Sequence, residues 1–247
     1  MDKPFLYFDT ETTDSNIKDL LQLAFVTDSD VQINLFFKPK QEISFLAMAV
    51  NHITPEMVAD KKFLEKTELP KENIDEEFKG RSLIEYLKFL AEKYIWVAHN
   101  IDFDKEVLEK KGITLPNTIC TLKLARNMFT NGENDLEGYS LQYLRYYLGL
   151  YKKENENHNT AHDALSDVHF LRDLFHYMQE NGKLTTESMI TISKEPQFMR
   201  KMTFGKYAGK TLEDIARIDR SYLEWIRDSM YDKPDLQWNA ERVLSMT

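Results

Sequence analysis

The sequence predicts an α/β fold, a central mixed β-sheet flanked by helices, followed by a small α+β domain. Over about the first 180 residues, apolar strand-like runs alternate with stretches whose apolar residues recur at helical spacing, which is typical of this class. After residue 182 the composition becomes polar, and Pro196 interrupts it, which indicates a linker. We therefore expect a first domain over residues 1–182, a linker over residues 183–200 and a small domain over residues 201–247.

The expected sheet begins with the apolar run Pro4-Phe5-Leu6-Tyr7-Phe8, whose lack of alternation indicates a strand buried on both faces. Two further strands are predicted over residues 20–27 and 32–38, on either side of the turn Asp28-Ser29-Asp30. An antiparallel meander is the simplest arrangement of these three strands. A brief fourth strand is expected over residues 95–98.

The remaining patterns are helical. In the first domain, helices are expected over residues 44–50, from Pro55, over 81–93, after a capping Asn100, within a strand-to-helix passage over 120–129, over 140–148 and, most clearly, after a capping box of Thr160 with Asp163. In the small domain, residues 202–210 indicate two short strands, and helices follow from a capping Thr211, over 221–230 and from Pro234.

Composition describes a globular chain. The 247 residues are 42% hydrophobic and 30% charged. No apolar run approaches the roughly 20 residues that a membrane span needs, and the N-terminus does not resemble a signal peptide. The single cysteine, Cys120, cannot form an internal disulfide, so a cytoplasmic protein is expected. The net charge of −9 argues against a general nucleic-acid coat protein, although not against an enzyme that grips a polyanion locally.

Two acids follow the first strand. Asp9 and Glu11 are two residues apart, so both side chains project from the same face. Carboxylates at the exit of a buried strand are costly without a cation. A hard divalent ion such as Mg²⁺ or Mn²⁺ is therefore expected there. An isolated Asp-x-Glu at the start of a solvated turn would be the simpler interpretation, so further acids must decide.

Two more acids and a histidine fit their local patterns poorly. Asp104 is on the core-facing side of its helix. Asp167 falls inside an apolar helical stripe, and His162, in the first turn of that helix, is near the same end. Each has an ordinary explanation by itself: ion pairing, capping or a packed histidine. Their joint occurrence with Asp9 and Glu11 indicates one site at the edge of the sheet.

A carboxylate cluster that binds two divalent ions is suited to phosphodiester cleavage. We hypothesise that Asp9 bridges two ions, that Glu11 and Asp167 complete one site, and that Asp104 holds the other. His162 would take the proton of the attacking water. On this scheme Asp9→Ala or Asp167→Ala abolishes metal-dependent cleavage and leaves the fold intact.

Three motifs, Asp9-x-Glu11, Asn100-x-x-Phe103-Asp104 and His162-x-Ala164-x-x-Asp167, resemble those of the DEDDh 3′–5′ exonucleases in order and separation. The resemblance covers about residues 4–180 and implies a ribonuclease H-like fold with the catalytic set named above. It also implies substrate contacts, which we expect at Thr10, Thr12, His52, Asn100 and Phe103. The chain has Asp14-Ser15-Asn16 where the family usually has Gly-Leu, near the 3′ end of the substrate, so single- or double-strand preference stays open.

The segment Phe204-Gly205-Lys206-Tyr207-x-Gly209-Lys210 resembles the small C-terminal domain of exodeoxyribonuclease X-type enzymes. That likeness implies a DNA substrate with a free 3′ end, and a role in repair. From the residues alone, Lys206 and Lys210 are candidates for contact with a nucleic-acid backbone, and Trp225 is expected in the core of the small domain.

Several alternatives share the catalytic motifs. A 3′–5′ exoribonuclease of the oligoribonuclease or ribonuclease T type would use the same residues, since no residue visibly recognises a 2′-hydroxyl. A proofreading subunit of a polymerase and a catalytically dead nucleic-acid-binding module are further readings. Both monomers and homodimers occur among relatives, so a homodimer is left open.

Overall fold

The computed structural model describes residues 3–69, 80–129, 136–153, 164–202, 204–231 and 233–246. The chain forms two compact units, Met1–Ser193 and Lys194–Thr247. Within the described ranges, no helix combines the length and the apolar character that crossing a membrane requires.

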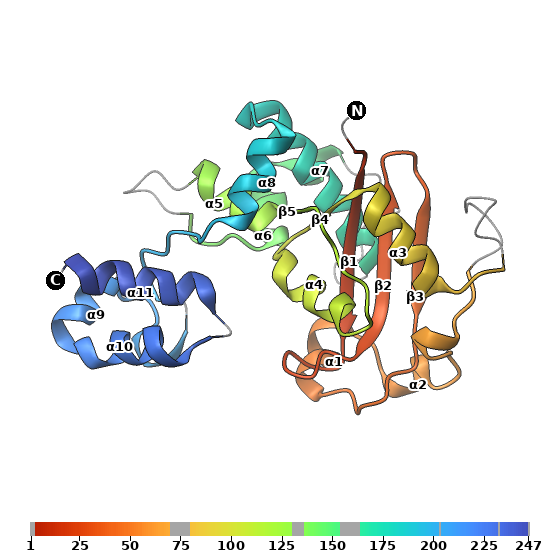
Figure 1. The fold of residues 1–247 in the computed structure, drawn as a ribbon, viewed down its shortest axis with the longest axis horizontal. Helices are drawn as coiled ribbons and strands as arrows, with labels where there is room; N and C mark the ends of the chain where they lie inside the picture. Colours follow the sequence, from red (N-terminus) through yellow and green to blue (C-terminus); the bar gives the residue numbers. More distant parts are fainter. Residues whose placement is uncertain are drawn as a thin grey trace. The chain divides into compact units, whose positions relative to one another are not determined.

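The first unit is built on one five-stranded sheet (Figure 1). Its strands are β1 (Phe5–Thr12), β2 (Leu20–Thr27), β3 (Gln32–Phe36), β4 (Ile95–Ala98) and β5 (Thr118–Cys120), in the order β3-β2-β1-β4-β5. β1 pairs antiparallel with β2 and parallel with β4, and β2 pairs antiparallel with β3. The predicted mixed sheet with an N-terminal meander is thus confirmed, and β1 lies at its centre.

Helices cover both faces of this sheet. They are α1 (Phe45–Asn51), α2 (Pro55–Val58), α3 (Leu83–Lys93), α4 (Ile101–Glu109), α5 (Thr121–Phe129), α6 (Leu141–Tyr147), α7 (Ala164–Gly182) and α8 (Thr186–Lys194). Short 3₁₀ turns lie at Leu64–Lys66 and Leu150–Lys153. α3 and α4 lie over one face of the sheet and α7 over the other (Figure 1). Their buried apolar side chains belong to two separate clusters, one on each face.

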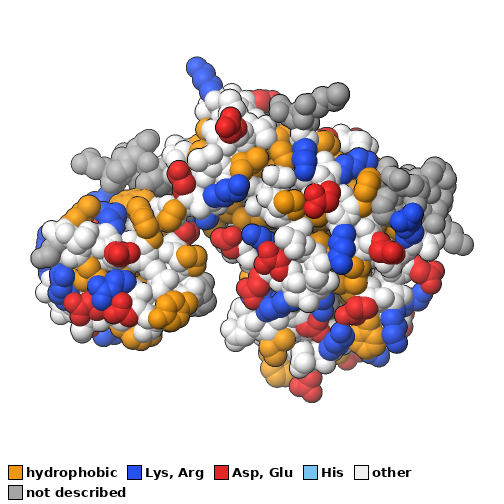
Figure 2. Space-filling model, viewed as in Figure 1, with side chains coloured by type: hydrophobic (Ala, Val, Ile, Leu, Met, Phe, Trp, Pro, Cys, Tyr) orange, Lys and Arg blue, Asp and Glu red, His pale blue; other side chains and the backbone are white. Residues whose placement is uncertain are grey.

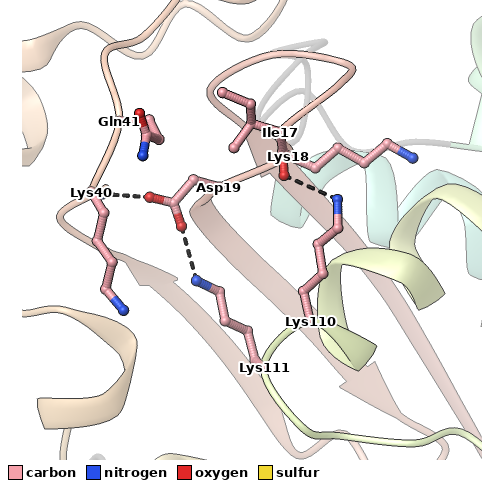
Figure 3. A pocket seen from close by; sticks show the side chains of 7 residues that line it. All are labelled: Ile17, Lys18, Asp19, Lys40, Gln41, Lys110 and Lys111. Carbon is pink, nitrogen blue, oxygen red and sulfur yellow. Dashed lines mark hydrogen bonds and ion pairs between the residues drawn. The ribbon is translucent and has the colours of Figure 1, made fainter.

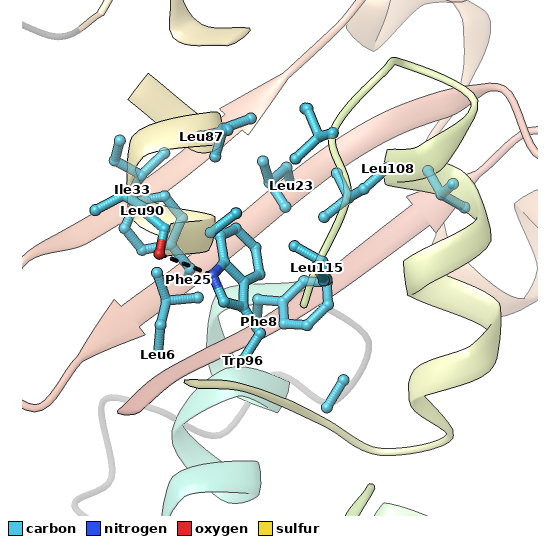
Figure 4. Packing of buried hydrophobic residues seen from close by; sticks show 14 of the residues in the cluster. Leu6, Phe8, Leu23, Phe25, Ile33, Leu87, Leu90, Trp96, Leu108 and Leu115 are labelled. Atoms are coloured by element: carbon cyan, nitrogen blue, oxygen red, sulfur yellow. Dashed lines mark hydrogen bonds between the residues drawn. The ribbon is translucent and has the colours of Figure 1, made fainter. Parts of the chain in front are cut away.

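Alternation along β1 assigns its residues to the two faces. Leu6 and Phe8 belong to the cluster under α3 and α4, where the ring of Phe8 meets that of Trp96 edge-on at 4.8 Å (Figure 4). Trp96 is anchored by a 3.2 Å hydrogen bond from its Nε1 to the Leu90 carbonyl. Tyr7 faces the opposite way, into the cluster that includes Phe175 of α7. Asp9 therefore projects toward the α7 side, and so does Glu11 two residues on.

Several helices begin at capping residues or at a proline. Ser82 and Glu85 form a capping box at α3, and Pro55 occupies the first turn of α2. Asn100 stands at the N-cap of α4 as predicted, with a φ of 69° and no side-chain hydrogen bond to the helix. The predicted capping box of Thr160 and Asp163 lies outside the described residues.

The division between the units falls after Ser193, inside the stretch expected to be a linker. Most of residues 183–200 form α8 or its flanks, and Met189 of α8 is buried in the core of the first unit. The Ser193 hydroxyl accepts a 2.8 Å hydrogen bond from the backbone N–H of Cys120 at the end of β5. The segment was expected to be a linker because it is polar. It contains α8, which buries only one face and packs on the first unit.

The second unit is a helical domain with its own core. It contains α9 (Leu212–Ile218), α10 (Arg220–Ser229), α11 (Pro234–Met246) and a 3₁₀ turn at Gly205–Tyr207. Thr211 caps α9 as predicted, by accepting a hydrogen bond from the Asp214 N–H. The two strands expected over residues 202–210 are reduced, among the described residues, to a single bridge between Lys201 and Thr211.

Trp225 does not enter the core of the second unit. Its side chain is 51% exposed, which corrects the expectation from sequence. The buried positions of α10 are Leu223 and Ile226, and Trp225 lies between them on the outer side of the helix. Its ring contacts that of Tyr222 at 5.7 Å.

Candidate metal centre

Three of the predicted acids come together where β1 leaves the sheet. Asp9 and Glu11 project from β1 toward α7, and Asp167 projects back from the first turn of α7. Each offers a carboxylate oxygen, and these oxygens all lie within 4.8 Å of one another. All three side chains are half-buried. Asp9 and Asp167 are 158 positions apart in the sequence. The fold brings them together, because β1 directs Asp9 and Glu11 to one face of the sheet and α7 packs on that face.

Asp104 reaches the same region from the other side of β1. It lies in the first turn of α4, 3% exposed, and its Oδ1 accepts two hydrogen bonds from Thr10. The Thr10 hydroxyl donates at 2.6 Å and the Thr10 N–H at 3.1 Å. β1 pairs with β4 only from Phe5 to Tyr7, and beyond that point Asp104 satisfies the Thr10 N–H.

Electrostatics at this cluster favour a bound cation. Burial raises the pKa of Asp9 well above its ordinary value, and the charges of Asp104, Glu11 and Asp167 raise it further. Burial also raises the pKa of Asp104 to about 7, although hydrogen bonds from Thr10 work in the opposite direction. Acids held this close disfavour one another's ionised forms unless positive charge is added. A set of carboxylate oxygens suits a hard divalent ion.

A glutamine that the sequence did not single out holds Asp167. Gln142 of α6 donates from Nε2 to the Asp167 Oδ1 at 2.7 Å. Its Oε1 accepts a 3.0 Å hydrogen bond from the buried Arg145, whose guanidinium lies 3.9 Å from the ring centre of Phe170. A glutamine on an amphipathic helix carries no signal by itself, because only the packing of α6 against α7 turns it toward the acid.

The predicted base, His162, lies outside the described residues, as does Asp163. The described part of α7 starts at Ala164, two positions further on.

Of the residues expected to contact substrate, Thr12 and His52 lie around the end of β1. The side chain of Asn51 donates a 3.2 Å hydrogen bond to the carbonyl of Thr12, the residue after Glu11. This bond holds the end of α1 next to the acids. His52 follows directly, exposed and with a φ of 57° at the end of α1. Asn51 is a second residue that the sequence left without a role.

Phe103 and Asn100 flank Asp104 at the start of α4. Phe103 is half-buried, with the Lys18 ammonium 4.5 Å from its ring centre. Asn100 is exposed and has the left-handed backbone conformation, directly before the first residue of α4. Thr10, in contrast, is buried and spends both its donors on Asp104, so it supports the acid instead of presenting a free group.

Lys206 and Lys210 belong to the second unit. The Lys206 ammonium bonds Asp219 at 2.8 Å and lies within 5 Å of the ring centres of Tyr207 and Tyr222. These contacts give Lys206 a structural role in the small domain. Lys210 is exposed.

A five-stranded mixed sheet in this order, with acids converging where its central strand ends, is the arrangement of the ribonuclease H-like fold. The chain belongs to the exonuclease family, whose model, described as Exonuclease, matches residues 6–175. Residues 202–228 match a second model, described as Exodeoxyribonuclease X-like C-terminal. The resemblance drawn from the sequence motifs is thereby confirmed for both parts of the chain, which is a hydrolase of the exonuclease class.

Individual relatives agree with this assignment. The chain is 32% identical over 219 residues to Exodeoxyribonuclease 10 of Escherichia coli K12, covering 85% of this chain and 83% of that protein. A solved structure of Exonuclease X in complex with 5′ overhanging duplex DNA is similar with a TM-score of 0.53 and 27% identity, over 76% of this chain and 99% of that one. Exonuclease I of E. coli with a dT13 oligonucleotide shares the fold, with a TM-score of 0.53 and 17% identity over 74% of this chain and 42% of that one.

Proposed function

We propose that the chain is a metal-dependent 3′–5′ exodeoxyribonuclease that removes nucleotides one at a time from the 3′ end of DNA. The convergence of Asp9, Glu11 and Asp167, with oxygens within 4.8 Å, carries the proposal, because it supplies a cation site in a chain of the exonuclease family. The DNA substrate is supported by the names of the relatives, one an exodeoxyribonuclease and one solved with duplex DNA. A role in DNA repair is part of the proposal.

The metal set that we propose is two Mg²⁺ or Mn²⁺ ions. Asp9 would contact both, Glu11 and Asp167 would complete one site, and Asp104 would hold the other. Bound at these carboxylates, divalent ions lower the pKa of a water and compensate the charge that develops at phosphorus. Thr10 and Gln142 orient Asp104 and Asp167, which keeps the ligand oxygens aimed at the shared space.

One protein group is assigned a role in proton transfer. We assign to the His162 imidazole the role of taking a proton from the attacking water, on its position five residues before Asp167 in the sequence. The water oxygen forms a bond to phosphorus and the bond from phosphorus to the 3′ oxygen breaks. The 3′ oxygen of the shortened strand leaves with the electron pair of that bond and takes up a proton to become a 3′-hydroxyl, and a 5′-mononucleotide is released.

The alternative of a 3′–5′ exoribonuclease uses the same chemistry and differs only in the sugar. The proofreading alternative has one relative in its favour, the DNA polymerase III subunit epsilon of Buchnera aphidicola, which is 26% identical over 223 residues. A dimer stays a prediction, and so does a cytoplasmic location, which rests on the single cysteine.

The substrate is tested with matched DNA and RNA oligonucleotides carrying a 5′ label. The chain should shorten the DNA in single-nucleotide steps in Mg²⁺ and leave it intact in EDTA, with RNA cut at least tenfold more slowly. RNA cut as fast as DNA would transfer the proposal to the exoribonuclease. Retention of Mn²⁺ in calorimetry without cleavage of either strand would leave a binding module.

A further inference from the structure

Tyrosine side chains gather on one short segment of the first unit. Four of the chain's 12 tyrosines lie within residues 143–151, on α6 and on the 3₁₀ turn that follows it. Three of them are widely exposed, with 58% of Tyr146, 55% of Tyr147 and 42% of Tyr151 open to solvent. A group of exposed large side chains of this kind indicates a surface that binds a partner.

Tyr146 is joined to the metal centre by two side chains of its own helix. Gln142 donates to Asp167 at 2.7 Å and accepts a 3.0 Å hydrogen bond from Nη1 of Arg145. The same nitrogen lies 3.5 Å from the Tyr146 hydroxyl oxygen, and the Arg145 guanidinium lies 5.1 Å from the centre of the Tyr146 ring. Tyr146 follows Gln142 by four residues, so the two are neighbours on one face of α6, with Cβ atoms about 5–6 Å apart. The exposed ring is therefore beside the residue that bonds Asp167.

A second exposed ring lies against that of Tyr146. The ring centres of Tyr146 and Tyr151 are 5.4 Å apart, and their planes are inclined at 46°. The Lys152 ammonium lies 5.9 Å from the centre of the Tyr151 ring. Aromatic rings with a cation beside them are the elements from which proteins build sequence-tolerant sites for single-stranded nucleic acid.

The other two tyrosines of the segment have a packing role. The rings of Tyr143 and Tyr147 stack at 5.9 Å with planes 14° apart, and the Tyr147 ring meets that of Phe129 of α5 at 6.3 Å. Tyr147 therefore joins α6 to α5. It is about as exposed as Tyr146 but is turned about 100° from it around the helix, which makes it a matched control.

Lysine charge near the loop after β1 is compensated by acids. A pocket of about 190 Å³ lies there (Figure 3), and the ammonium groups in its lining are bonded to Asp19, Glu65 or Glu106; they belong to Lys18, Lys40, Lys110 and Lys111. On the face shown in Figure 2, blue and red side chains are interspersed. A strand that reaches the metal centre therefore has more to gain from contact with its bases than from these lysines.

We infer that Tyr146 and Tyr151 form a stacking surface for a base of the substrate strand beside the metal centre. The inference rests on the proposed function, since it presumes a polynucleotide at Asp167. Because the two ring planes are inclined, one ring can stack on the face of the base while the other contacts its edge. Every base offers an aromatic face, so the contact places the strand without reading its sequence. Arg145, which is buried, positions the Tyr146 ring.

The test separates contact with a base from contact with the sugar-phosphate backbone. Two fluorescent single-stranded DNA 12-mers are compared by anisotropy in EDTA: an intact strand, and one whose last three nucleotides at the 3′ end lack their bases. The variants are Tyr146→Ala, Tyr151→Ala and Tyr146→Phe, with Tyr147→Ala as the control. Melting temperatures establish that each is folded, and Tyr151→Ala decides the matter if Tyr146→Ala does not fold.

For the intact strand we expect the affinity to fall about tenfold in Tyr146→Ala and about fivefold in Tyr151→Ala, which is the order of one lost stacking contact. Tyr146→Phe and Tyr147→Ala should stay within about twofold of the wild type. The wild type should bind the strand without 3′ bases at least about tenfold more weakly, and Tyr146→Ala should weaken that binding no further. Equal losses on both strands, an equal loss in Tyr147→Ala, or no loss in either tyrosine-to-alanine variant of the pair would overturn the inference.

Calorimetry with Mn²⁺ tests for an indirect effect through Arg145 and Gln142. Tyr146→Ala should keep the wild-type affinity for Mn²⁺, whereas a loss as large as that for DNA would mean that the ring acts on Asp167 and not on a base. If the wild type shortens no DNA in Mg²⁺, the proposed function fails, while the comparison of the two strands still decides whether the tyrosines hold a base.

Discussion

The Asp104 carboxylate is held by Thr10 through two hydrogen bonds, a 2.6 Å bond from the hydroxyl and a 3.1 Å bond from the backbone N–H. Both bonds favour the ionised form of Asp104, whose pKa burial nevertheless raises to about 7. Replacing Thr10 by valine removes the hydroxyl donor and keeps the shape. A hydrogen bond to a charged group contributes about 1.5–3 kcal/mol, so the pKa of Asp104 should rise by about one unit or more.

The measurement is the pH dependence of kcat/KM at a fixed Mg²⁺ concentration well below saturation, where protonation of Asp104 competes with metal binding. In Thr10→Val the acid limb should move to higher pH by about one unit. Thr27→Val is the matched control, because Thr27 is a buried threonine of β2 whose hydroxyl contacts only the turn before β3. An unmoved acid limb in Thr10→Val would show that Asp104 does not depend on this bond.

Gln142 should govern how well Asp167 holds metal. Gln142→Met removes the 2.7 Å bond to Asp167 at similar side-chain length. Loss of a group that orients a ligand typically lowers metal affinity about 10- to 100-fold, and we expect a loss in this range for Mn²⁺ measured by calorimetry. Gln237→Met provides the control, since Gln237 makes a comparable 2.8 Å bond to a carbonyl in the second unit. An unchanged Mn²⁺ affinity in Gln142→Met would show that Gln142 does not orient Asp167 for metal binding.

His99 predicts a loss of stability in acid. Its ring nitrogens contact the Thr121 hydroxyl at 2.9 Å and the Tyr139 carbonyl at 2.8 Å, and burial lowers its pKa to about 4. The unfolded chain takes up a proton at this residue below about pH 6.5, while the folded chain does so only near pH 4. The stabilisation is therefore complete above pH 6.5 and decreases as the pH falls. Between pH 7 and pH 5 the loss amounts to about 2 kcal/mol.

Urea unfolding of the wild type and His99→Gln at pH 7 and pH 5 isolates this contribution. The stability difference between the two proteins should shrink by about 2 kcal/mol at pH 5. Exposed His52→Gln serves as the control for the substitution itself. A difference that is the same at both pH values would exclude His99 as the source.

The sequence predicted the sheet because its strands carry strong local signals. The run of Phe5 to Phe8 is apolar, residues 20–27 end at the turn Asp28-Ser29-Asp30, and residues 95–98 are an apolar run after a helical pattern, so β1, β2 and β4 were expected where they lie. The convergence of the acids was likewise predictable in outline, since Asp104 and Asp167 conflict with their helical patterns.

What the sequence did not reveal depends on contacts between distant elements. α8 is polar on its outer face and was expected as a linker, because nothing local shows that Met189 meets the core. Gln142 acquires its role only when α6 packs beside α7. Trp225 was expected inside because it is large and aromatic, yet α10 buries Leu223 and Ile226, and the tryptophan lies on the other side.

Repulsion among the clustered acids predicts that an inactive variant is the more stable protein without metal. Because the pKa of Asp9 is raised in the folded chain, stability is lost as the pH rises from the ordinary carboxyl pKa to the raised one, and the loss is complete above it. In EDTA at high pH, Asp9→Asn should therefore melt about 3 °C or more above the wild type. Added Mg²⁺ should raise the melting temperature of the wild type and change that of Asp9→Asn little. A variant that melts below the wild type in EDTA would contradict the repulsion.

The most direct test of the metal centre is the stepwise shortening of a 5′-labelled DNA strand in Mg²⁺ by the wild type and by Asp9→Asn. Asp9 lies between Glu11, Asp104 and Asp167, whose charges all act on it, so the loss of its carboxylate should disable the whole group. We predict a single-nucleotide ladder from the 3′ end for the wild type and a fall in rate of at least about 1,000-fold for the folded variant. A variant that cuts within tenfold of the wild-type rate would show that these acids are not where the phosphodiester is hydrolysed.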